Sequence, residues 1–275
     1  MKNQIAFLTT IFPIPEDYLI QFFESLEKQT IKNFDVLVVN DGYKNFSSLR
    51  LKFDKLNIIE IESSDSPAKN REVGINFAIE QAYKTLIFGD SDDYFSKNRV
   101  EVSLKLLSKY DLVVNDLTLF NYSGVYKSKY ISNRLPNGYE VSLDFVKEKN
   151  VFGFTNTAVN LNKVSKVSFN PDIVAVDWYF FTTLLLKGTT AVFTNQCISY
   201  YRQHEDSLIG LKVLSLPALK TGLLAKLNHY KNFPEFECLH RKIQYLLGLD
   251  RELLFMKLKE QDVLEYPLWW EEVKG

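Results

Sequence analysis

Cysteine is nearly absent from this sequence, since only Cys197 and Cys238 occur among its 275 residues. Neither has another cysteine or a histidine at metal-ligand spacing, so we expect no disulfide framework and no zinc site. Two free thiols are typical of a protein in a reducing cytoplasm. The sequence also lacks a run of about 18 uncharged apolar residues and a small-residue cleavage site near its start. We therefore expect a cytoplasmic protein with no membrane span and no signal peptide.

An excess of charge of one sign is missing as well. The 33 basic residues are balanced by 34 acidic ones, which gives a formal net charge of -1. Nucleic-acid binding needs Lys and Arg clustered on one face, so we expect no nucleic-acid partner. Apolar residues make up 46% of the chain, enough to bury the core of one domain plus an appendage.

Glycine-rich phosphate-binding motifs are also missing. The sequence contains neither Gly-x-Gly-x-x-Gly nor Gly-x-x-x-x-Gly-Lys-Ser/Thr, which excludes the dinucleotide fingerprint and the P-loop. It has no Gly-x-Ser-x-Gly elbow, so the usual reason to propose an α/β-hydrolase is absent. If the chain binds a nucleotide, a metal ion must therefore help to hold the phosphates.

Strand-like and helix-like segments alternate along the first half of the chain, which predicts a largely parallel sheet covered by helices. One helix has apolar residues at i, i+3, i+4 and i+7 from Leu19. Ser66, followed by Pro67, predicts the N-cap of a second helix that ends near Tyr83. Ser96 is expected to cap the next helix. The strand candidates are residues 5–10, 34–39, 57–61 and 85–88.

From residue 111 the pattern becomes richer in strands, so we expect the sheet to become mixed. Strands are expected at residues 112–120, 125–130 and 190–193, and a helix at 174–186. Beyond Gly210 the chain reads as helices rich in Leu and Lys. We expect Leu223, Leu224 and Leu227 to pack these helices on the main domain.

Polar side chains gather where two of the predicted strands end. Asn40 and Asp41 follow one strand, and the segment Asp-Ser-Asp-Asp at residues 90–93 follows another. Ligands of open α/β sheets bind outside the carboxyl ends of the strands. Three carboxylates within four residues repel one another unless a cation shares them, and Mg²⁺ or Mn²⁺ suits such oxygen ligands. The alternative is that these acids only cap the helix near Ser96 or form a solvated turn.

Six segments occur in a defined order between residues 4 and 208. They are residues 5–10, 36–42, 68–71 with Gly74, 88–93, Asp177 with Trp178, and 200–204. In this order and spacing, they resemble the motifs of the family 2 inverting glycosyltransferases with the A-type fold.

The resemblance implies an α/β fold with a Rossmann-like, mixed and mainly parallel sheet flanked by helices. It implies a catalytic domain at residues 1–210, with a nucleotide-sugar-binding half at 1–110 and an acceptor-binding half at 111–210, and a C-terminal helical extension at 211–275. The implied reaction is the metal-assisted transfer of a sugar, with inversion, from a nucleoside diphosphate sugar to a saccharide or glycolipid hydroxyl. UDP-sugars are the favoured donors.

Many enzymes of this kind build bacterial surface polysaccharides or glycolipids. The resemblance therefore also implies peripheral contact with the inner face of the cytoplasmic membrane. The oligomeric state, the donor sugar and the identity of the acceptor stay open.

The resemblance further assigns roles to individual residues. Asp177 resembles the catalytic base, Asp92 the principal ligand of Mn²⁺ or Mg²⁺, and Asp93 a supporting carboxylate. His204 resembles a histidine that also reaches the metal, and Asp90 an acid on the ribose or metal side. A larger set is expected to contact the nucleotide sugar: Thr10, Asn40, Asp41, Lys69, Asn70, Arg71, Asp90 and Ser91.

These residues also have structural interpretations. Asp is common in the first turn of a helix, where Asp177 is expected, as a cap or as a favourable charge. A single histidine such as His204 is often a hydrogen-bonded structural residue. The basic residues at 69–71 can be surface charge, and aromatic residues such as Phe154 and Trp178 can pack in the core instead of stacking against sugars.

Two departures from the family pattern and two rival functions complete the sequence-based picture. The usual Asp-Asp-Gly-Ser turn begins here with Asn40 and ends with Tyr43, and Val176 replaces the acid that often precedes the base. A nucleotidyltransferase also uses acids and a metal on an α/β sheet, but normally has a basic, Gly-rich loop after its first strand. The other alternative is a catalytically inactive relative that acts as a binding or assembly module.

Overall fold

Successive residues of the central strands pack into two different apolar clusters. In β1 (Ile5–Ile11), Phe7 belongs to one cluster, whereas Ala6 and Leu8 belong to the other. Because neighbouring side chains of a strand point to opposite faces, the two clusters lie on the two sides of the sheet. The computed structural model describes residues 3–204, 216–250, 253–254, 256 and 267–271.

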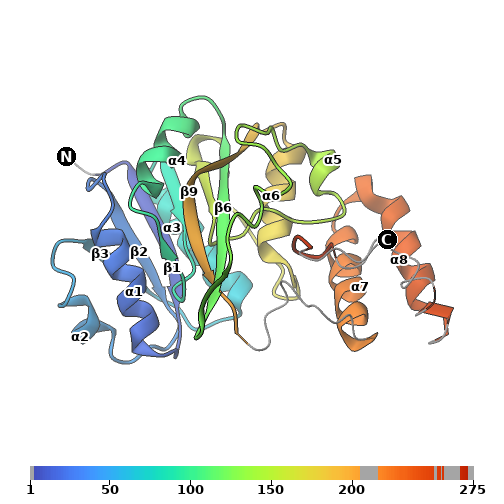
Figure 1. Cartoon of the computed structure of the whole chain (residues 1–275), viewed down its shortest axis with the longest axis horizontal. Helices are drawn as coiled ribbons and strands as arrows, with labels where there is room; N and C mark the ends of the chain where they lie inside the picture. Colours follow the sequence, from blue (N-terminus) through green and yellow to red (C-terminus); the bar gives the residue numbers. More distant parts are fainter. Residues whose placement is uncertain (1–2, 205–215, 251–252, 255, 257–266, 272–275) are drawn as a thin grey trace.

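Helices cover both faces of the sheet, which explains why β1, β2 and β4 are mostly apolar and buried. Phe22 of α1 and Val100 of α4 pack on the face that carries Phe7. Ile75 of α3 and Phe181 of α6 pack on the opposite face (Figure 1). The helices up to residue 186 are α1 (Glu16–Glu27), α2 (Phe46–Arg50), α3 (Pro67–Glu80), α4 (Arg99–Leu107), α5 (Leu143–Val146) and α6 (Val176–Leu186).

The described residues form one mixed sheet with the strand order β3-β2-β1-β4-β8-β6-β9-β5, and β7 also pairs with β6. The first four strands are parallel, β8 is antiparallel to both of its neighbours, and β6 and β9 are parallel. The remaining strands are β2 (Asp35–Asn40), β3 (Asn57–Glu62), β4 (Thr85–Phe88), β5 (Tyr94–Phe95), β6 (Leu112–Asn121), β7 (Gly124–Lys127), β8 (Thr157–Asn160) and β9 (Ala191–Arg202). The carboxyl ends of β1, β2 and β4 therefore meet at one edge of the sheet.

Strand β9 is much longer than the expected strand at residues 190–193. Its pairing with β6 jumps from Thr194, opposite Asn115, to Ile198, opposite Asp116, so the residues between them bulge out of the ladder. The polar residues of this bulge interrupt the apolar pattern, although the strand resumes and continues to Arg202. This continuation brings residues 200–202 beside the acidic segment 90–93.

The expected cap at Ser96 is wrong. Helix α4 begins at Arg99, and Asn98 occupies its N-cap position. The hydroxyl of Ser96 instead donates to the Asn98 side chain (2.9 Å) and accepts from the Ile198 backbone N–H (3.0 Å). The hydroxyl therefore ties β5 to β9. The cap at Ser66 is confirmed, because its side chain accepts from the Lys69 N–H.

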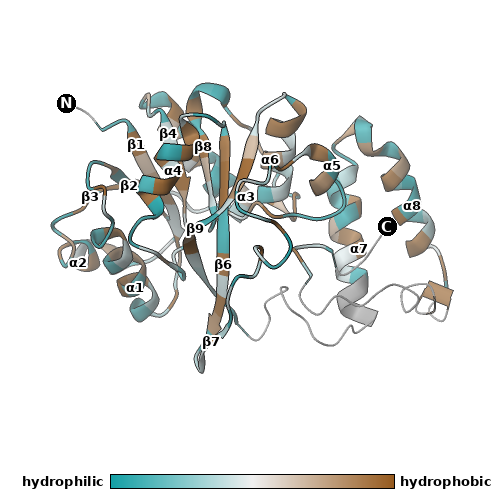
Figure 2. Ribbon diagram, turned by 45° about the horizontal axis from the view of Figure 1, so that its top comes forward, coloured by the Kyte–Doolittle hydropathy of each residue, from teal (hydrophilic) through white to brown (hydrophobic). Residues whose placement is uncertain are grey.

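The helices after Gly210 pack on α6 through a third apolar cluster. They are α7 (Leu216–Tyr230) and α8 (Glu237–Leu247). Hydrophilic and hydrophobic residues alternate along α8 (Figure 2). Leu223 is fully buried and Leu227 packs against the same cluster, as expected, but the prediction for Leu224 is wrong because 54% of its surface is exposed. Within the described part of the chain, no helix is long and apolar enough to cross a membrane.

Candidate functional site

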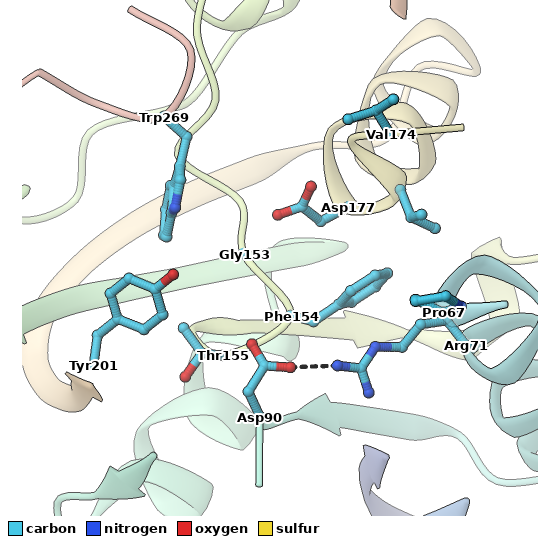
Figure 3. Close-up of a pocket in the computed structure, with 11 residues that line it drawn as sticks. Pro67, Arg71, Asp90, Gly153, Phe154, Thr155, Val174, Asp177, Tyr201 and Trp269 are labelled. Atoms are coloured by element: carbon cyan, nitrogen blue, oxygen red, sulfur yellow. Dashed lines mark hydrogen bonds and ion pairs between the residues drawn. The ribbon is translucent and has the colours of Figure 1, made fainter. Parts of the chain in front are cut away.

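A pocket of about 220 Å³ opens beyond the carboxyl end of β4 (Figure 3). The start of α3, the segment before β8, the first turn of α6 and the end of β9 contribute to its wall, together with one residue from the C-terminal part of the chain. The lining residues are Pro67, Arg71, Asp90, Gly153, Phe154, Thr155, Val174, Val176, Asp177, Tyr201 and Trp269. Asp90, Arg71 and Asp177, which the sequence places far apart, thus share one cavity.

Arg71 connects two strand ends across this pocket. Its guanidinium donates one hydrogen bond to the hydroxyl of Thr10, near the end of β1, and forms an ion pair with the Asp90 carboxylate, just after β4. The same guanidinium lies over the ring of Phe154, 5.2 Å from its centroid. Both partners of the ion pair are only partly exposed, so Arg71 brings a fixed positive charge to the pocket wall.

The backbone just before Asp90 packs closely against two aromatic rings. A Cβ atom on Gly89 would lie 2.5 Å from the ring of Phe7 and 2.7 Å from the ring of Phe95, so only glycine fits there. Burial raises the pKa of Asp90, Arg71 lowers it, and the nearby Asp92 raises it again.

Asp92 forms a pair with His204 on the solvent side of the same segment. The Nε2 atom of His204 lies 2.9 Å from Oδ2 of Asp92, and this hydrogen bond raises the pKa of the imidazole. About a fifth of the Asp92 side chain (22%) and half of the His204 side chain (49%) are exposed. The two side chains that the resemblance assigns to a metal are therefore in hydrogen-bonding contact with each other.

The donor chemistry of this pair fits a divalent ion only if the substrate supplies further ligands. A carboxylate and an imidazole suit Mn²⁺, and Mg²⁺ takes one or two carboxylates with phosphate oxygens and water. Among the described residues, no group of three or more His, Cys, Asp or Glu side chains could hold a metal. A nucleotide diphosphate could complete the coordination of an ion held by Asp92 and His204.

Asp93 is completely buried and connects the acidic segment to β9 and to the segment before β8. One carboxylate oxygen accepts the N–H of Arg202 (2.7 Å), and the other accepts the hydroxyl of Thr155. Burial raises the pKa of Asp93 well above its usual value. With both oxygens directed at β9 and the segment before β8, Asp93 has the surroundings of an anchoring carboxylate rather than an exposed metal ligand.

Arg99 lies buried beneath the acidic segment. One nitrogen donates to the carbonyl of Phe88 (2.5 Å), and the guanidinium lies 4.3 Å from the centroid of the Phe95 ring. Its other two side-chain nitrogens have no partner among the residues described. Burial lowers the pKa of Arg99 to about 10. A charge at this position balances the carboxylates above it, and nothing in the local sequence distinguished Arg99 from a surface arginine.

Asp177 lies in the first turn of α6, with its carboxylate directed into the pocket (Figure 3). The N-cap position belongs to Ala175, so Asp177 is not the cap residue, although its Oδ1 atom accepts the N–H of Trp178 (2.7 Å). Burial raises its pKa to about 7, against the lowering effect of the Trp178 N–H. Asp177 thus has the location and the pKa that a general base requires.

Not every residue of the expected nucleotide set points into this pocket. The Asn40 amide bonds with the backbone of Tyr43 and with Glu60. Asn70 is buried and bonds with Ser63 and Asp65, while Lys69 pairs with Glu72 (2.8 Å). These three side chains stabilise the turn after β2 and the start of α3.

Asp41 and Ser91 have polar side chains without a hydrogen-bond partner among the described residues. Asp41 is half-buried after β2, and its carboxylate has no hydrogen-bond partner among the residues described. Ser91 is 1% exposed, and its hydroxyl likewise lacks a partner within the described ranges. They lie on the same edge of the sheet as Thr10 and Asp90.

Two aromatic residues of the pocket were not assigned a role from the sequence. Tyr201 belongs to a segment noted for its resemblance to the family, and Trp269 to an aromatic stretch beyond the predicted domain. Their ring centroids lie 5.7 Å apart with planes inclined by 68°. No sequence pattern links residue 269 to a pocket built by residues 67–201.

A family model described as "Glycosyl transferase family 2" matches residues 11–165. The chain belongs to glycosyl transferase family 2. The matched span contains the acidic segment 90–93 but ends before Asp177. The assignment to the family therefore rests on residues 11–165 and does not by itself identify a base.

Two curated relatives show how far the sequence similarity extends. An uncharacterized glycosyltransferase of Rickettsia bellii (strain RML369-C) is 33% identical over 121 residues, which are 41% of this chain and 17% of that protein. The UDP-Glc:alpha-D-GlcNAc-diphosphoundecaprenol beta-1,3-glucosyltransferase WfaP of Escherichia coli is 25% identical over 208 residues, 73% of this chain and 78% of that protein. The chain spans only about a fifth of the length of the Rickettsia relatives that it matches (17–21%).

Solved structures share the fold at low sequence identity. Residues 1–349 of S. aureus TarS in complex with UDP-GlcNAc align with a TM-score of 0.60 and 17% identity, over 93% of this chain and 78% of that one. GalNAc-T7 with UDP, GalNAc and Mn²⁺ aligns with a TM-score of 0.56 and 10% identity, over 74% of this chain and 44% of that one. The α/β A-type glycosyltransferase fold expected from the sequence is thereby confirmed.

Proposed function

We propose that this chain transfers a sugar, with inversion, from a UDP-sugar to a hydroxyl group of a saccharide or glycolipid acceptor. The observation that carries the proposal is the carboxylate of Asp177, which shares a pocket with the Arg71–Asp90 ion pair and has a pKa raised to about 7. A carboxylate with this pKa can accept a proton near neutral pH and release it after the reaction.

The reaction is a single displacement at the anomeric carbon. The acceptor oxygen forms a bond to this carbon while the bond to the diphosphate oxygen breaks on the opposite face, and the electron pair leaves with the nucleoside diphosphate. The hydroxyl proton of the acceptor passes to Asp177. Asp177 projects from a rigid helix that is packed on two sides, so the carboxylate is held in place without the substrate.

The nucleotide-binding role falls to residues at the carboxyl ends of β1, β2 and β4. Arg71, fixed by Thr10 and Asp90, supplies positive charge, and half-buried Asp41 offers an unpaired carboxylate on the same edge. A divalent ion held by Asp92 and His204 supplies charge neutralisation for the leaving diphosphate when it is bound. The presence of UDP and Mn²⁺ in the GalNAc-T7 structure supports this choice of donor and metal.

The names of two relatives support the proposed acceptor class. WfaP is named for transfer to a sugar attached to diphosphoundecaprenol, and a Bacillus subtilis relative is named as a putative teichuronic acid biosynthesis glycosyltransferase. These names support a role in bacterial surface polysaccharide or glycolipid synthesis. They also support peripheral contact with the membrane that carries such acceptors.

A panel of nucleoside diphosphate sugars tests the proposal directly. With Mn²⁺ present, a UDP-sugar at about 100 times its dissociation constant should add about 2.7 kcal/mol to the free energy of unfolding. The enzyme should also hydrolyse the same UDP-sugar slowly when no acceptor is present. A protein that shows neither effect with any donor would be an inactive binding or assembly module, and release of pyrophosphate from a nucleoside triphosphate and a sugar phosphate would instead indicate a nucleotidyltransferase.

A further inference from the structure

The C-terminal residues 267–271, here called the strap, are fastened to the second half of the main domain. Glu271 is 8% exposed and forms a two-pronged ion pair with the guanidinium of Arg134. Lys149 approaches the same carboxylate to 3.5 Å. The strap therefore ends in a carboxylate that is held by two cations.

Backbone contacts fix the rest of the strap. The hydroxyl of Tyr130 donates to the carbonyl of Pro267, and the N–H of Asn150 donates to the carbonyl of Trp269 (2.8 Å). Leu268 is completely buried in the main apolar cluster. These contacts fix the backbone from which the indole of Trp269 projects.

The indole of Trp269 forms part of the wall of the candidate active site. Trp269 and Tyr201 are both partly exposed and form one side of the pocket, while Pro67 and Arg71 form the other and Asp177 lies between them (Figure 3). A Cβ atom on Gly153 would lie 3.1 Å from the Trp269 ring, so a larger residue at this position would crowd the indole. The two inclined rings make a corner that opens to the pocket, with the hydroxyl of Tyr201 directed toward the indole (Figure 3).

We propose that Trp269, positioned by the strap, forms with Tyr201 the surface that binds the sugar ring of the acceptor. A pyranose ring has a face of C–H groups that packs against an aromatic ring, while its hydroxyl groups stay free for polar partners. The corner lies across the pocket from Arg71, the cation of the nucleotide side, and beside Asp177, the group that takes the hydroxyl proton. This inference rests on the proposed glycosyltransferase function and specifies its acceptor as a saccharide rather than an aliphatic alcohol.

Steady-state kinetics of Trp269→Ala test the role of the ring. The probe acceptor is an α-GlcNAc diphosphate with a short alkyl chain, and the donor is UDP-glucose. The KM for the acceptor should rise roughly 3- to 10-fold in Trp269→Ala. The acceptor KM of Trp269→Phe should lie between those of Trp269→Ala and the wild type. The KM for the donor should change less than about twofold. A shift in the donor KM instead would place the ring on the donor side and overturn the proposal.

Trp270→Ala is the matched control, since it removes an indole from the same strap. Trp270 packs against the cluster between α6 and the C-terminal helices and does not line the pocket. It can therefore lower the melting temperature without the rise in acceptor KM. Arg134→Ala, which releases Glu271, should lower the melting temperature and also raise the acceptor KM. An unchanged KM in both Arg134→Ala and Trp269→Ala would reduce the strap to a structural brace.

Fluorescence separates this proposal from the proposed function. Titration with the probe acceptor should change the tryptophan emission of the wild type but not that of Trp269→Phe. A wild type that turns over the probe without this change, or that transfers glucose equally well to the alkyl alcohol lacking the sugar, overturns the acceptor surface and leaves the transferase function intact. A wild type that binds neither the probe nor any UDP-sugar of the donor panel overturns both.

Discussion

The imidazole of His229 stacks on the indole of Trp178, with ring centroids 3.8 Å apart and planes inclined by 6°. His229 belongs to α7, and Trp178 follows Asp177 on α6, so this stack joins the C-terminal helices to the helix of the candidate base. Both rings are buried, and within the described ranges the two ring nitrogens of His229 have no hydrogen-bond partner. Burial holds the pKa of His229 well below its usual value, and Lys226 acts in the same direction.

We expect this stack to make stability depend on pH on the acid side. In the unfolded chain, His229 titrates near a pKa of about 6.5, whereas in the folded protein it stays neutral to much lower pH. Below that value the unfolded state binds more protons, so the free energy of unfolding decreases as the pH falls, by at most about 1.4 kcal/mol per unit. Urea unfolding of wild type and His229→Phe at about pH 7.5 and about pH 5.5 measures the difference. If both proteins lose the same free energy between these two conditions, the buried neutral histidine is not the cause.

Asp177→Asn should lower kcat by roughly 10²-fold or more, because the amide cannot accept the proton of the acceptor. UDP binding should persist. Ionising Asp177 in the folded protein is unfavourable, as its raised pKa shows, so the variant should melt at a higher temperature than wild type above about pH 7. The kcat of the wild type should fall as the pH decreases through about 7, where the base becomes protonated. An Asp177→Asn enzyme with normal kcat would mean that the base lies elsewhere and that Asp177 serves only the first turn of α6.

Asp92→Ala should remove the part of UDP binding that depends on Mn²⁺, because the ion loses its carboxylate ligand. Isothermal titration with UDP, with and without Mn²⁺, measures this part for wild type and variant. Glu60→Gln is a suitable control, since Glu60 contacts only the Asn40 amide at the neighbouring strand end among the hydrogen bonds of the described residues. A variant of Asp92 that binds UDP in Mn²⁺ as tightly as wild type would contradict the assignment.

Asp93 should affect stability more than metal dependence. Asp93→Ala leaves the N–H of Arg202 and the hydroxyl of Thr155 without their acceptor, which should cost about 1–3 kcal/mol for each buried group. Asp93→Asn should cost less, because its amide oxygen can still accept the N–H. Urea unfolding measures both, alongside the Mn²⁺ dependence of UDP binding. If Asp93→Asn folds normally but loses that dependence, Asp93 is a ligand rather than an anchor.

The edge of the sheet where residues 40–41 and 90–93 lie could be predicted from the sequence because its signals are local. An apolar strand that ends in acids, as at Asp90, predicts both the element and the edge of the sheet where it ends. The cap at Ser66 followed by Pro67 likewise fixes the start of α3, and with it the direction of Arg71. In each case, the residues that determine the structure lie within one turn or one strand of each other.

The remaining features depend on contacts between distant segments. The sequence pattern predicts that Ser96 caps a helix. In the structure its hydroxyl instead accepts the N–H of Ile198, which lies 102 residues later. The same holds for Trp269, whose place in the pocket depends on Arg134 and Asn150. Asn40 illustrates a third case, because its type suits a ligand contact while its amide is occupied by Tyr43 and Glu60.

The bulge in β9 separates two kinds of position. The number of residues can change within the bulge, whereas it cannot change in the paired segment that follows. Residues 195–197 stand outside the ladder, so an insertion or deletion there need not disturb the pairing on either side. From Ile198 onward each residue is paired one to one with β6, and the side chains alternate between faces. Tyr201 faces the pocket, while Arg202 faces Gln21 and Tyr18 on the other side. Losing one residue after the bulge would exchange them, turning an apolar pocket wall into a cationic one. Homologues should therefore vary in length at 195–197 and keep a constant count from there to the end of the strand.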